Sequence, residues 1–162
     1  MKREQYIWAL LRIGMGWIFL WAFLDKTFGL GFSTLPEKTW ISGNSPTYEF
    51  LKFATIGPFT DFYQEIAGNQ IIDWIFMLGL LLIGLALIFG IGIKLAGYSG
   101  ALMLFLMYTA GFLPPKNNPF LDEHIIYIII MIGLAITKSG DSFGLGKLWK
   151  KIKIVRKHPF LE

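Results

Sequence analysis

The sequence has no cysteine and little charge. Without cysteine, the 162-residue chain holds no disulfide, no thiolate metal ligand and no dithiol redox centre. Charged residues make up 16% of it, whereas about 25% is typical of soluble domains. Hydrophobic residues make up 54%, and so small a chain has no interior large enough to bury them all. These figures, with 17% aromatic residues, exclude an intrinsically disordered chain and predict an integral membrane protein.

Long uncharged runs dominate the sequence. A hydrocarbon layer about 30 Å thick needs about 20 residues of helix to cross it. The fourth run is short, but Asn118 as N-cap and Pro119 as first helical residue would extend it. We therefore predict an all-α integral membrane protein, a four-transmembrane-helix bundle that forms a single domain over residues 1–162. The expected helices cover residues 6–24, 71–93, 95–113 and 119–137.

The flanking charges predict how these helices are oriented. One side, with the N-terminus, the turn at Lys94 and the tail 138–162, carries ten basic and three acidic residues. The other side carries four basic and eight acidic residues. Because cytoplasmic flanks are rich in lysine and arginine, we expect a multi-pass protein of the cell membrane with both termini cytoplasmic. The expected partner of the basic residues is the lipid bilayer rather than nucleic acid, and the first helix is expected to be retained rather than cleaved as a signal peptide.

The outer loop 26–70 is long enough to form structure of its own. Pro46 and Pro58 each follow a turn signal, and Phe59, Phe62 and Tyr63 follow at helical spacing. We expect short interfacial helices here with their aromatic faces on the membrane. The alternative is that these aromatic side chains cap the mouth of the bundle. The basic tail 138–162 is expected to lie on anionic cytoplasmic headgroups.

Arg12 is the one basic residue inside a predicted span. It lies about 9 Å along the helix from Tyr6, close enough for its side chain to snorkel to the headgroups. An ion pair with Asp141, or a contact with a quinone or lipid, remains open. The apolar runs Ile75–Ile93 and Leu95–Leu113 hold no carboxylate, which disfavours a proton-coupled carrier or pump.

The densest polar cluster lies at the start of the fourth predicted helix. At 100° per residue, Glu123, His124 and Tyr127 share a face, whereas Asp122 points away from Glu123. A carboxylate, an imidazole and a phenol there suit a quinone headgroup, which His124 could supply with protons. The simpler interpretation is that the acidic residues favour the helix dipole and His124 meets headgroups. No metal site is expected, because adjacent residues diverge and His158 lies in the tail.

The first helix ends on the same expected side. Trp21 and Asp25 share a face, and Lys26 follows. If this face meets the cluster of the fourth helix, one aromatic-walled polar pocket results, with Asp122, Asp25, Lys26 and Trp21 binding the quinone and Glu123, His124 and Tyr127 acting on it. No flavin, haem or nicotinamide motif is visible.

Four stretches of the sequence carry a family resemblance. The first helix contains RIGMGWIFLWAFLDK, and the second contains GLLLIGLAL. NPFLDEHIIY opens the fourth helix, and GLG with VRKHP marks the tail. Over nearly its whole length the chain resembles archaeal members of the DoxX family of small membrane proteins.

The resemblance implies a four-helix bundle and a link to respiratory oxidoreductases. The related DoxD is the membrane subunit of a thiosulfate:quinone oxidoreductase and works beside a second subunit, DoxA. By this resemblance the chain is expected to be a subunit of a quinone-linked oxidoreductase that needs a second protein subunit or forms a homo-oligomer. The alternative is a non-catalytic scaffold or accessory subunit of a larger membrane complex.

Overall fold

The computed structural model of the chain describes residues 3–162, and every regular element in this range is a helix. Three helices are long and apolar enough to cross a membrane. They are α1 (Arg3–Phe28), α3 (Gln70–Phe89) and α4 (Ile93–Gly111). α5 (Glu123–Ile136) is also apolar but has 14 residues, about 21 Å of helix. Three of the four predicted spans are thus helices long and apolar enough to cross a membrane, and the fourth crossing stays a prediction.

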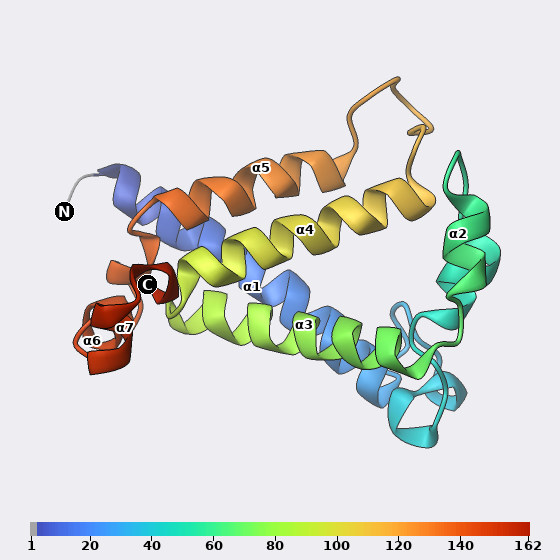
Figure 1. The fold of residues 1–162 in the computed structure, drawn as a ribbon, viewed down its shortest axis with the longest axis horizontal. Coiled ribbons are helices and arrows are strands. Elements are labelled where there is room, and N and C mark those ends of the chain that lie inside the picture. The colour runs from blue at the N-terminus through green and yellow to red at the C-terminus, as the bar shows by residue number, and fades with distance from the viewer. Residues whose placement is uncertain (1–2) are drawn as a thin grey trace.

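The long helices run in alternating directions (Figure 1). α1 packs on α3, α3 on α4, and α4 along α5. α1 begins at the end of the bundle where the chain terminates, and the loops around α2 lie at the opposite end. The segments predicted to form the basic side therefore lie at one end of the bundle, and the outer loop of the acidic side lies at the other end. Which end faces the cytoplasm stays a prediction.

Glycine sets the boundary between α3 and α4. Asn69 caps α3 by accepting a hydrogen bond from the backbone N–H of Ile71 at 2.9 Å. Gly90 ends the helix in the left-handed conformation at φ 73° and donates to the carbonyl of Ala86, as is common at helix C-termini. The second helix therefore ends at Phe89, earlier than the predicted residue 93.

α5 begins later than predicted because its N-cap is Asp122, not Asn118. The Asp122 carboxylate accepts from the backbone N–H of His124 at 3.1 Å and of Ile125 at 3.3 Å. Asn118 instead accepts from the N–H groups of Phe120 and Leu121. Both types of side chain cap turns well, but here Asn118 closes a turn in the preceding loop.

Small residues let the helices approach closely. A Cβ atom at Gly84 would lie 2.8 Å from the backbone nitrogen of Leu20 in α1, and one at Gly97 would lie 2.7 Å from the Cβ of Ala135 in α5. Inside a bilayer the hydrophobic effect does not drive helices together, so close packing of this kind favours their association. On the outside, large apolar side chains stay exposed, as at Leu82 (61%) and Ile129 (61%), which fits a surface covered by lipid.

The outer loop does contain short helices, including α2 (Thr60–Glu65). Tyr63 is buried, and its hydroxyl lies 3.1 Å from the carbonyl oxygen of Leu106 and 2.7 Å from Thr109 Oγ1, both in α4. Tyr63 therefore fastens the loop to the end of the bundle. Phe59 and Phe62 remain exposed, and their place in a membrane interface stays a prediction.

Arg12 does not snorkel; its side chain is fully buried. Its Nη1 donates to the backbone carbonyls of Leu87 and Ile88 at the end of α3. Its Nη2 donates to the backbone carbonyls of Ser142 and Phe143, at 3.1 and 2.9 Å. The prediction of a headgroup contact was wrong because those carbonyls compete for the guanidinium. The negative end of the helix dipole, at the C-terminus of α3, also favours a positive charge at this position.

The alternative ion pair between Arg12 and Asp141 is not formed either. Asp141 accepts from Lys150 Nζ at 2.8 and 3.0 Å.

Candidate functional site

An open apolar groove runs between α1 and α5. Its volume is about 440 Å³, within the usual range of small-molecule sites. The groove exists because α1 packs mainly on α3 and diverges from α5 toward the loop end (Figure 1). Its walls are Ile7, Leu10, Leu11, Gly14, Met15 and Ile18 from α1, with Tyr127 and Ile130 from α5.

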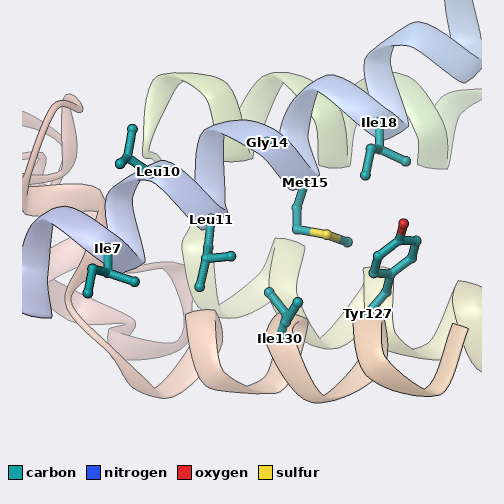
Figure 2. A pocket seen from close by; sticks show the side chains of 8 residues that line it. All are labelled: Ile7, Leu10, Leu11, Gly14, Met15, Ile18, Tyr127 and Ile130. Atoms are coloured by element: carbon teal, nitrogen blue, oxygen red, sulfur yellow. The ribbon is translucent and has the colours of Figure 1, made fainter. Parts of the chain in front are cut away.

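Tyr127 supplies the polar side-chain group of this groove. Figure 2 shows its ring standing on α5 with the hydroxyl directed toward α1, near Met15 and Ile18. Within the described residues the hydroxyl forms no hydrogen bond, whereas those of Tyr63 and Tyr108 both do. A half-buried phenol of this kind can donate to an oxygen of an otherwise apolar molecule.

Gly14 keeps the middle of the groove open. No heavy atom outside its immediate surroundings lies within 4 Å of a Cβ atom built there, and the position lines the cavity. In Figure 2 Gly14 lies beside Met15, whose side chain projects from α1 toward α5. A larger residue at position 14 would therefore occupy the groove without distorting the bundle.

His124 lies one helical turn before Tyr127 and is buried. Its Nδ1 is 2.7 Å from Asp122 Oδ2, so the capping carboxylate also orients the imidazole. The ring lies against Phe112, with centroids 4.2 Å apart. If Nδ1 carries the proton that bonds Asp122, Nε2 is left as an acceptor, and no described residue donates a hydrogen bond to it.

Glu123 is exposed, and none of the hydrogen bonds or ion pairs of the described residues involves it. Helical periodicity places it on the face of Tyr127 and Ile130. The structure thus keeps Glu123, His124 and Tyr127 on adjoining parts of α5, with Asp122 bonded to the histidine.

Asp25 is not part of this arrangement. It is buried at the end of α1, where its carboxylate accepts from the backbone N–H of Phe32 at 3.2 Å and from the N–H and hydroxyl of Ser33 at 2.9 and 2.7 Å. Trp21 stacks edge-on against Phe32 at 5.1 Å. The loop that follows α1 thus folds back onto both residues.

The end of α1 and the start of α5 lie apart in the bundle (Figure 1). The single polar pocket predicted from Asp25, Lys26, Trp21 and the α5 cluster is therefore not formed. Asp25 binds its own loop instead.

Sequence reasoning also missed two features. Asp73, in the first turn of α3, is buried and accepts from Ser45 Oγ at 2.8 Å and from Thr47 Oγ1 at 2.6 Å, which ties the outer loop to the bundle. Phe112, the ring against His124, lies in an irregular segment with no pattern to mark it.

The chain matches no family model, no curated protein and no solved structure.

Proposed function

We propose that the chain is the membrane subunit of a quinone-linked oxidoreductase and that the groove between α1 and α5 holds the quinone. The observation that carries the proposal is the Tyr127 hydroxyl, which has no partner among the described residues and faces an otherwise apolar cavity of about 440 Å³. A quinone has the same character, since its ring and tail are apolar and its carbonyl oxygens accept hydrogen bonds.

His124 and Asp122 would provide the protons in this proposal. Quinone reduction consumes two electrons and two protons, and an imidazole exchanges protons readily near neutral pH. The 2.7 Å contact with Asp122 fixes the orientation of the imidazole ring. The electrons would come from a donor held by a second subunit, as the resemblance to the DoxX family implies.

Binding of a radiolabelled short-chain quinone to the full chain in nanodiscs tests the proposal. Tyr127→Phe keeps the ring and removes the hydroxyl. The loss of one neutral hydrogen bond, about 0.5–1.5 kcal/mol, predicts a Kd raised about 2- to 13-fold. Gly14→Leu should abolish saturable binding because the new side chain fills the groove.

The matched control is Leu82→Phe, which adds bulk to an exposed position on α3. It should bind like the wild type, and empty nanodiscs report quinone that merely dissolves in lipid. Wild-type binding that is not saturable, or that survives Gly14→Leu, would exclude the groove as the quinone site.

A second function, as an accessory subunit of a larger complex, is favoured by exposed aromatic side chains in the outer loop and in the loop between α4 and α5. Phe32, Phe53 and Phe120 are each about three-quarters exposed there, at 76%, 74% and 75%. A protein partner could cover them. A chain that binds no quinone yet co-purifies with one partner, and loses it in a Phe53→Ser/Phe120→Ser variant, would establish this function instead.

A further inference from the structure

The C-terminal segment folds into a compact unit, residues 143–162, which we call the cap. It contains α6 (Gly146–Trp149), α7 (Lys153–Lys157) and a final turn. Trp149 Nε1 donates to the carbonyl of Leu161 at 2.6 Å, which closes the cap on itself. Val155 is fully buried.

The cap is fastened to the turn between α3 and α4. Lys94 donates from its backbone N–H to the carbonyl of Glu162 and from Nζ to the carbonyl of Pro159, both at 2.9 Å. The N–H of Leu145 donates to the carbonyl of Phe89, the last residue of α3, at 2.8 Å. Because this turn joins two membrane-length helices, the cap lies at the depth where hydrocarbon gives way to headgroups.

The exposed charge of the cap is of one sign. Lys150 pairs with Asp141 at 2.8 Å, and Lys94 lies 4.0 Å from Glu162, which is the one acidic residue of the cap. The remaining five basic side chains are exposed and form no ion pair with any described residue. They are Lys147, Lys151, Lys153, Arg156 and Lys157.

Large apolar side chains alternate with these charges and remain exposed. They are Phe143, Leu145, Leu148, Ile152, Ile154 and Phe160. In water such a surface would leave apolar area uncovered, whereas at a membrane interface the apolar groups enter the acyl boundary and the ammonium groups reach phosphates.

We propose that the cap is a docking surface for anionic phospholipid headgroups. Zwitterionic lipid would cover the apolar side chains equally well, but its headgroups carry no net negative charge to balance five cations, so the charge pattern selects lipids with net negative headgroups. The surface lies at the end of the bundle away from the start of α5 (Figure 1), where His124 lies, and the inference does not depend on quinone binding.

The absence of cysteine makes a direct test simple. Leu148→Cys introduces one thiol at an exposed position of α6, which is labelled with an environment-sensitive fluorophore. The full chain is reconstituted in vesicles of phosphatidylcholine with and without phosphatidylglycerol. We expect a blue-shifted, quencher-protected label only with phosphatidylglycerol. The double substitution Lys147→Gln/Lys151→Gln should lower the ratio of embedded to exposed label about 25-fold, since each basic side chain raises membrane affinity about fivefold.

The control is Lys52→Gln/Lys116→Gln, which removes two exposed lysines at the opposite end and should leave the label unchanged. High salt should weaken the protection in phosphatidylglycerol. Equal protection in both lipids would show that apolar contact alone holds the cap, and a label exposed in both would show that the cap faces water. Either result overturns the proposal.

Discussion

Replacing Arg12 by leucine should destabilise the bundle strongly. The guanidinium donates to four carbonyls, two at the end of α3 and two in the 142–143 loop. Leucine fills similar space but leaves all four acceptors without a donor in a region that water does not reach. An unsatisfied buried acceptor costs about 1–3 kcal/mol, while removal of a buried charge offsets part of that loss.

We expect Arg12→Leu to lower the free energy of unfolding by about 3–5 kcal/mol. For a chain of this size that corresponds to a fall in Tm of roughly 10 °C, measured by tryptophan fluorescence during heating in detergent. The loop that follows α5 should also become sensitive to protease, because Ser142 and Phe143 lose their donor.

Two variants separate this role from others. Arg12→Lys keeps the charge but lacks the planar fork that reaches both pairs of carbonyls, so its Tm should fall by an intermediate amount. Arg3→Leu removes an exposed arginine from the same helix and should change little. An Arg12→Leu protein that melts within about 2 °C of the wild type, less than about 1 kcal/mol, would refute the role given to this side chain.

Three further predictions concern packing, capping and topology. Gly14→Ala should raise the free energy of unfolding by about 0.5–1 kcal/mol, because glycine is unfavourable in a helix and the site has room for a Cβ atom. Gly84→Ala should lower it by about 1–3 kcal/mol, because the new Cβ atom meets the backbone of Leu20. Thermal melting distinguishes the two signs. Asp122→Ala should cost about 1 kcal/mol through loss of the α5 cap and broaden the His124 ring signals in NMR as the imidazole loses its partner. A single cysteine at position 116 should react with a membrane-impermeant reagent in intact cells, whereas one at position 151 should react only after the cells are permeabilised. Reaction of both positions in intact cells would contradict the orientation.

The class of protein was readable from the sequence because it depends on totals and on the length of apolar runs. The exact start of α5 could not be predicted from individual residue types. Asn118 and Asp122 are both good caps, and propensity alone could not choose between them. The choice depends on the loop after α4, where Asn118 closes a turn of its own and leaves Asp122 to cap α5 and to hold His124.

Contacts between distant segments could not be predicted from spacing. The partners of Arg12 lie 75 to 131 residues away, and the loop that binds Asp25 follows it by seven or eight residues but folds back without a recognisable motif. The groove also depends on which helices pair. Nothing in the pattern of α1 says that it packs on α3 and leaves one face open toward Tyr127.

The most direct measurement of the central claim is photo-crosslinking of a short-chain azidoquinone to the full chain in native membranes, mapped by mass spectrometry. The account predicts labelled peptides from 10–18 of α1 and from 127–130 of α5, lost on competition with unlabelled quinone and in Gly14→Leu. Labelling confined to other helices, or labelling that Gly14→Leu leaves unchanged, would contradict it.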